Sequence, residues 1–109
     1  MNDEILLVLT NMPDAASAEQ LAHAIIAHHA AACVNQLAPC TSTYRWQNAI
    51  EKTTEVPLLI KTTRAAYPRL EQLIDAAHPY DLPEIIALPV TLGLPAYLSW
   101  VNQATLVKE

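Results

Sequence analysis

The stretch of sequence that decides the fold is TSTYRWQNAIEKTTEVPLLIK, residues 41–61. Residues 42–46 alternate between two sets of side chains in the two-residue repeat of a strand. Gln47 and Asn48 follow and supply a turn, because Asn tolerates a positive φ better than most residues. Residues 56–60 then continue as a returning strand. The pattern predicts a long, twisted β-hairpin.

The returning strand contains a proline, Pro57. Proline has no backbone N–H and cannot donate a hydrogen bond to a neighbouring strand. We therefore expect either a sheet edge or a bulge at this point of the hairpin.

The segments before the hairpin predict a strand and a helix. Residues 5–9 form a short apolar run with branched side chains, which is typical of a buried strand. Residues 15–32 are rich in alanine, and their larger apolar side chains recur at helical spacing, so they predict a helix. Asp14 or Ser17 can cap its amino end.

The segments after the hairpin predict a helix, a strand and a short last helix. The second helix covers residues 67–77, with a proline at its favoured first position, and ends before Pro79. Residues 84–88 predict a strand that Pro89 stops, and residues 95–101 a short helix. The order β-α-β-β-α-β-α is that of an α+β, ferredoxin-like domain with a split β-α-β arrangement. With 109 residues, the chain is expected to form one domain, residues 1–109.

Composition narrows the possible partners and the location. The chain carries 6 Lys plus Arg against 11 Asp plus Glu, a net charge of -5, which argues against nucleic acid and against an anionic membrane. No apolar stretch is long enough for a transmembrane helix. Asp3 and Glu4 stand where a signal peptide would carry basic residues. We therefore expect a cytoplasmic protein without a membrane or nucleic-acid partner.

The cysteines and the clustered histidines predict no metal or disulfide framework. Cys33 and Cys40 are too few for such a framework, and their spacing matches no zinc pattern, so both are expected to be small buried or half-buried hydrophobes. His23, His28 and His29 have the wrong spacing for a helical metal pair and predict a solvated helix end.

Few residues indicate chemistry directly. No nucleophile-and-base pattern is present, and a single glycine allows no phosphate loop, so the sequence does not predict an enzyme. Residues 78–84 (HPYDLPE) form a loop that contains an imidazole, a phenol, two carboxylates and two prolines that stiffen the backbone. Such a loop can position a ligand site, or its prolines can merely end the preceding helix. Tyr44 and Trp46 can stack on a ligand or fill a core or interface. Lys61 ends an apolar strand, where an exposed charge disfavours pairing with strands of other molecules.

The whole pattern resembles the CutA family of divalent-cation tolerance proteins. The matching stretches run in family order: residues 31–35 (AACVN), 42–46 (STYRW), 60–63 (IKTT), 78–80 (HPY) with 83–85 (PEI), and 97–100 (YLSW). The resemblance implies a ferredoxin-like fold assembled as a homotrimer, with the long hairpins pairing between subunits. It also implies a relation in architecture to the trimeric PII signalling proteins, which bind small ligands between subunits.

The same resemblance implies a role in tolerance of copper and other divalent cations. His78 falls on the motif histidine that is a candidate copper ligand in the family. Thr10 and Ala77 stand where some bacterial members have a cysteine and a second histidine. A threonine hydroxyl and a methyl group are not copper ligands, so any copper site here would depend on His78.

Two hypotheses about function follow. In the first, the trimer binds a metal ion, copper or another divalent cation, or a small anionic ligand between subunits. Lys61 would meet an anion, His78 and Glu84 a metal, and aromatic side chains would exclude water. The full candidate lining is Cys33, Tyr44, Trp46, Lys61, His78, Tyr80 and Glu84. In the second, the protein is a PII-like trimeric signalling protein or a scaffold with no dedicated metal site.

Overall fold

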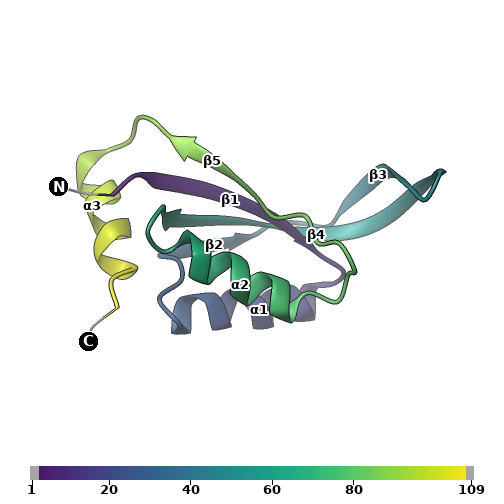
Figure 1. The fold of residues 1–109 in the computed structure, drawn as a ribbon, viewed down its shortest axis with the longest axis horizontal. Helices are drawn as coiled ribbons and strands as arrows, with labels where there is room; N and C mark the ends of the chain where they lie inside the picture. Colours follow the sequence, from purple (N-terminus) through teal and green to yellow (C-terminus); the bar gives the residue numbers. More distant parts are fainter. Residues whose placement is uncertain (1–2, 108–109) are drawn as a thin grey trace.

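The computed structural model describes residues 3–107, which form five strands and three helices. These are β1 (Ile5–Met12), α1 (Ala15–Ala27), β2 (Cys33–Gln36), β3 (Cys40–Trp46), β4 (Ala49–Thr63), α2 (Tyr67–Ala77), β5 (Ile86–Val90) and α3 (Pro95–Ala104). Helices α1 and α2 lie side by side on one face of the sheet, and α3 lies at its end (Figure 1). No helix within residues 3–107 is long and apolar enough to cross a bilayer.

The sheet has the predicted ferredoxin-like topology. Its strands are antiparallel to their neighbours in the order β2-β4-β1-β5, and β3 pairs with β4 off this path. Strand β4 therefore lies between β1 and β2, which is the split β-α-β arrangement. The first part of β4, residues 49–55, pairs with β3 alone. This two-stranded hairpin, hereafter the arm, projects away from the body of the molecule (Figure 1).

The core lies between the sheet and the two long helices. Val8 of β1 pairs with Ile60 of β4, and both side chains are fully buried on the helix-covered face. The helices meet them with Leu21 and Ile25 of α1 and with Leu70 and Ile74 of α2, all buried in the same cluster. Burial of a Val, Leu or Ile side chain stabilises a fold by roughly 1.5–3 kcal/mol, so this layer holds the body together.

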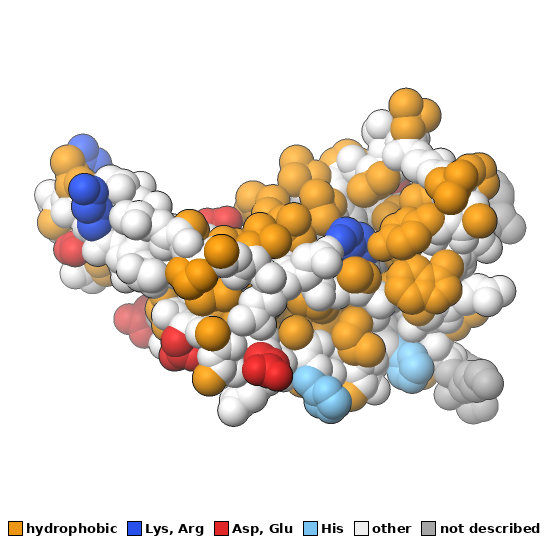
Figure 2. All heavy atoms as spheres, turned by 180° about the vertical axis from the view of Figure 1, so that it is seen from behind, with side chains coloured by type: hydrophobic (Ala, Val, Ile, Leu, Met, Phe, Trp, Pro, Cys, Tyr) orange, Lys and Arg blue, Asp and Glu red, His pale blue; other side chains and the backbone are white. Residues whose placement is uncertain are grey.

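The other face of the sheet has no helix layer and is strongly apolar. The register places two rows of side chains on it: Cys33, Lys61, Leu7 and Leu88, and Asn35, Leu59, Leu9 and Ile86. Ile86 and Leu88 are 50% and 48% exposed. Figure 2 shows hydrophobic side chains gathered over this side of the molecule. We call this surface, defined by the two rows, the open face.

A bulge lies opposite Pro57, as the sequence analysis expected. Gln36 pairs with Leu58 and Cys40 with Glu55, so three residues, 37–39, face only two residues of β4, 56 and 57. The Pro57 carbonyl accepts a hydrogen bond from the N–H of Leu37. The side of Pro57 that lacks an N–H therefore points towards the bulge, where no partner carbonyl requires it. Strand β2, which precedes the bulge, was not predicted.

Helix α1 ends at Ala27, so the prediction that it reaches residue 32 is wrong. His29 has a φ of 55°, and the N–H groups of His29 and Ala30 bond to the carbonyls of Ile26 and Ile25. These two bonds form a Schellman motif, whose left-handed position is usually a glycine. Histidine fills it here, because His is one of the few non-glycine residues that adopt a positive φ.

The predicted hairpin turn is confirmed, whereas the predicted end of the last strand at Pro89 is wrong. Gln47 and Asn48 have φ values of 49° and 67°, which confirms the tight hairpin turn. Pro89 does not stop the last strand, since it lies inside β5 and pairs with Leu6. Strand β5 is the edge of the sheet, where a proline is tolerated because its N–H is not needed.

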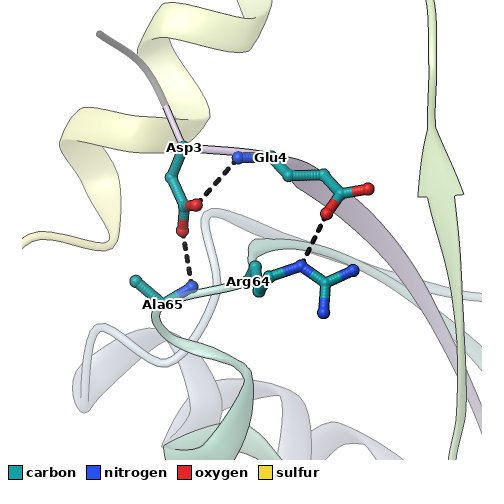
Figure 3. Close-up of polar contacts among 4 residues, drawn as sticks. All are labelled: Asp3, Glu4, Arg64 and Ala65. Carbon is teal, nitrogen blue, oxygen red and sulfur yellow. Dashed lines mark hydrogen bonds and ion pairs between the residues drawn. The ribbon is translucent and has the colours of Figure 1, made fainter.

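Polar contacts fix the start of β1 against the turn between β4 and α2. One Asp3 carboxylate oxygen accepts a bond from the N–H of Ala65 at 2.5 Å and the other from the N–H of Glu4 at 2.9 Å (Figure 3). The Glu4 carboxylate pairs with Nε of Arg64 at 2.5 Å. The Asp3 N–H bonds to the side chain of Asn102 in α3 at 2.9 Å, so β1, β4 and α3 meet at this end.

Candidate functional site

A cleft of about 710 Å³ lies where the arm leaves the body. One wall comes from β3 and β4, and the other from the end of β1 and the loop of residues 80–84. Figure 2 shows the hollow between the arm and the body. The side chains around the cleft are mostly polar or aromatic: Asn11, Ser42, Thr43, Tyr44, Arg45, Trp46, Thr53, Glu55, Tyr80, Asp81, Leu82 and Glu84.

His78 lies behind the wall of the cleft and is 8% exposed. Its Nε2 atom is 2.6 Å from the backbone carbonyl oxygen of Asn11. Its Nδ1 atom is 3.3 Å from the backbone nitrogen of Tyr80. A carbonyl only accepts and a backbone N–H only donates, so the proton is on Nε2 and the Nδ1 lone pair receives the Tyr80 N–H. Both ring nitrogens are thus used within the chain.

Tyr80 connects this buried imidazole to the cleft. Its ring lies 4.6 Å from that of His78, at an angle of 54°. Burial, followed by the charge of Glu55 and a hydrogen bond to it, raises the pKa of Tyr80 to about 12. The phenol is therefore protonated at neutral pH and lies beside the Glu55 carboxylate.

Glu55 is the buried carboxylate of the site, with 7% of its surface exposed. It lies at the last paired position of the arm, opposite Cys40, where β4 enters the body. No sequence pattern predicted Glu55 as a site residue. The available signal was its position directly before the buried run that starts at Val56, where a charged side chain needs a partner.

Asn11 joins the end of β1 to the segment of residues 78–84, and no sequence pattern predicted it as a site residue. Its backbone carbonyl holds His78, and its side-chain Nδ2 lies 3.5 Å from Oε1 of Glu84. It occupies the next-to-last position of β1, opposite Pro57. The pairing of β1 with β5, in which Leu9 lies opposite Ile86, brings this residue to the loop, so its sequence position alone gave no indication.

The predicted site residues fall into two groups. Tyr44, Trp46, Tyr80 and Glu84 line the cleft, with His78 behind it. Cys33 and Lys61 lie elsewhere, paired with each other on the open face. Lys61 is six residues from Glu55 along β4, about 20 Å at 3.3 Å per residue.

Cys33 and Lys61 share one polar partner. The Lys61 ammonium group and the Cys33 thiol both donate to the side-chain oxygen of Asn35, the thiol at 3.9 Å. Burial, followed by the neighbouring Cys33, raises the pKa of Tyr97. Cys33 is half-buried, as expected, but Cys40 is exposed on the arm and both thiols are free, so Cys40 is not the buried hydrophobe that was predicted.

Comparison with known proteins places the chain in a family. Residues 6–104 match the family model described as CutA1 divalent ion tolerance protein. The chain belongs to the CutA1 family. A divalent-cation tolerance protein CutA of Thermus thermophilus is 41% identical over 99 residues, which cover 91% of this chain and 96% of that protein. Protein CutA of Mus musculus is 42% identical over 93 residues, 85% of this chain and 52% of the mouse protein.

Solved structures of the CutA1 family have the same fold. CutA from Xylella fastidiosa superposes with a TM-score of 0.90 at 44% identity and covers 93% of this chain and 97% of its own. CutA1 from Oryza sativa gives a TM-score of 0.93 at 33% identity, with 98% of each chain covered. The relatives from Thermus thermophilus and Citrobacter koseri are named as divalent-cation tolerance proteins.

The residues of this CutA1 chain do not fit a copper site centred on His78. Neither nitrogen of that imidazole has a free lone pair, as described above. Thr10 has a fully buried hydroxyl without a hydrogen-bond partner, but a hydroxyl is a poor ligand for copper. Within residues 3–107, no three His, Cys, Asp or Glu side chains lie close enough together to hold a metal ion.

Proposed function

We propose that the chain acts in divalent-cation tolerance as a binding protein whose ligand occupies the cleft beside the arm. The observation that carries this proposal is the largely buried Glu55, which lies beside Tyr80 at the edge of a 710 Å³ cleft. A cleft of this size, with aromatic walls and a few convergent polar groups, is typical of a small-molecule site. His78 then serves to position Tyr80 rather than to bind metal.

The proposal includes assembly of several copies. The open face exposes Ile86 and Leu88 beside Leu7 and Leu9, and contiguous apolar surfaces of this kind are usually covered by a partner. The resemblance implies a homotrimer, and we take three as the proposed number of subunits. The cleft adjoins the arm, so we expect a neighbouring subunit to border it.

Metal-challenge growth tests the function. Cells that lack the gene are complemented with the parent chain, with Glu55→Gln or with Glu51→Gln, and grown in graded copper and zinc. Glu51 is an exposed carboxylate on the same arm and lies outside the cleft, so its variant is the matched control. We expect Glu55→Gln to lose tolerance and Glu51→Gln to keep it.

A scaffold role is the second candidate, and the apolar open face favours it. In that case the tolerance of cells carrying Glu55→Gln would equal that of the parent, while a charge placed on the open face would abolish it. Equal tolerance in all complemented strains and in the strain without the gene would refute both functions.

A further inference from the structure

We propose that the cleft binds an organic cation with N–H donors, an alkylamine or a guanidinium compound, and that Glu55 is its anchor. This inference rests on the proposed function, since it names the class of ligand for the same cleft. Three independent features carry it: the charges around the cleft, the unsatisfied capacity of Glu55, and the aromatic rings of the arm.

The charges around the cleft favour a cation. Its lining contains three carboxylates, Glu55, Asp81 and Glu84, and one cationic side chain, Arg45. Lys61, which could have received an anion, lies far along β4 and does not line the cleft. A cleft with an excess of one charge concentrates ligands of the opposite charge. An anionic ligand is therefore disfavoured here.

Glu55 has acceptor capacity that the chain itself does not use. A carboxylate has about four lone-pair sites, and the neighbouring Tyr80 phenol can fill only one of them. Among residues 3–107, the ion pair of Arg64 with Glu4 is the only one, so no cation of the described chain pairs with Glu55. An ammonium or guanidinium group would supply both the opposite charge and N–H donors for the remaining acceptor sites of this carboxylate.

The arm supplies aromatic walls suited to a cation. Tyr44 and Trp46 are two residues apart on β3, so they project from the same side of the strand. Both line the cleft, with 43% and 39% of their surfaces exposed. Aromatic rings attract organic cations through their negative faces. The volume of 710 Å³ accommodates an organic molecule, whereas a bare metal ion would leave most of it unfilled.

Calorimetric titration of the assembled protein with agmatine tests the inference, because agmatine carries both an ammonium and a guanidinium group. The neutral analogue 1,4-butanediol, the anion succinate and the ions Mg²⁺ and Zn²⁺ are titrated in parallel. We expect saturable binding of agmatine and none of butanediol or succinate. Glu55→Gln should weaken agmatine binding by at least about tenfold, and Tyr44→Leu by about threefold. Glu51→Gln should leave the affinity within about twofold, since an exposed charge is screened.

Four results would overturn the assignment. They are no binding of agmatine to the folded protein, unchanged binding in Glu55→Gln, displacement of agmatine by Zn²⁺ at equal concentration, and loss of assembly in Glu55→Gln. The last would place Glu55 in a subunit contact. If agmatine fails to bind while Glu55→Gln still abolishes metal tolerance, the cleft keeps its function and only the ligand class is wrong.

Discussion

The Nε2 atom of His78 lies 2.6 Å from the backbone carbonyl oxygen of Asn11. This hydrogen bond fastens the residue after α2 to the far end of β1, and the second ring nitrogen receives the N–H of Tyr80. A residue that the family resemblance marks as a copper ligand thus joins two segments of the backbone. Its effect on the cleft passes through Tyr80 and Glu55.

Replacement of His78 should loosen the loop of residues 80–84. His78→Ala removes two hydrogen bonds and a buried ring, so we expect a loss of about 2 kcal/mol in the free energy of unfolding, measured with urea. Amide exchange of Tyr80 should accelerate as well. His23→Ala, at an exposed position of α1, is the control and should change neither quantity. Unchanged exchange at Tyr80 in His78→Ala would contradict the role assigned to His78.

Copper binding should not depend on His78. The exposed histidines at the end of α1 can bind copper weakly, but the His78 nitrogens are both engaged. Titration of Cu²⁺ should therefore give the same affinity and stoichiometry for the parent chain and for His78→Gln. A lower stoichiometry in His78→Gln would show that the imidazole leaves its backbone partners to bind the metal.

Removal of the Thr10 hydroxyl should stabilise the protein. This hydroxyl is buried without a hydrogen-bond partner. Thr10→Val removes the unsatisfied group and keeps the shape, so we expect a gain of about 1 kcal/mol in the free energy of unfolding. Thr62→Val is the matched control, because its buried hydroxyl donates to the Ala30 carbonyl at 2.7 Å and its loss should destabilise. Equal effects of the two substitutions would contradict this explanation.

Stability should fall in alkaline solution, partly through Tyr80. Burial and the neighbouring Glu55 raise its pKa from 10.0 to about 12 in the folded chain. The unfolded chain therefore loses the phenol proton first, so stability present below pH 10.0 is lost as the pH rises towards 12. Tyr80→Phe should flatten this fall, measured by urea unfolding at about pH 9 and about pH 11. Tyr67, whose pKa burial also raises to about 12, contributes separately. An unchanged slope in Tyr80→Phe would refute the assignment.

Assembly should depend on the open face. Leu88→Asp places a charge in the middle of β5, on the apolar part of the open face, so we expect the mass in solution to fall to that of a smaller species, measured by light scattering. Ile26→Asp, at an exposed apolar position of α1, is the control and should keep the parent mass. A parent mass in Leu88→Asp would mean that copies meet through another surface.

Local patterns predicted most elements of the fold, but not where each one ends. The hairpin turn at Gln47 and Asn48 and the helix that starts at Tyr67 depend on nearby residues, so their signals are visible in the sequence. The end of α1 depends on His29 taking a left-handed conformation that glycine usually takes, so no glycine in the sequence marks it. Strand β5 continues through Pro89 because it is the edge of the sheet, which is a fact of tertiary structure.

The candidate site was predicted only in part, because some of its residues are local in sequence and others are not. Tyr44 and Trp46 share one strand, and Tyr80 and Glu84 share one loop, so each pair is local. Glu55 and Asn11 meet the loop of residues 80–84 only because β1 pairs with β4 on one side and with β5 on the other. Assembly as a trimer and a cytoplasmic location remain predictions.

The position of β1 between β4 and β5 determines when the sheet can form during synthesis. Val8 pairs with Ile60 on one side and with Ala87 on the other. During synthesis, the first strand must therefore wait for partners from the second half of the chain, and its apolar residues stay unpaired meanwhile. Pairings of such long sequence separation close late and slowly. We expect newly made chains to need protection from aggregation until β5 has emerged.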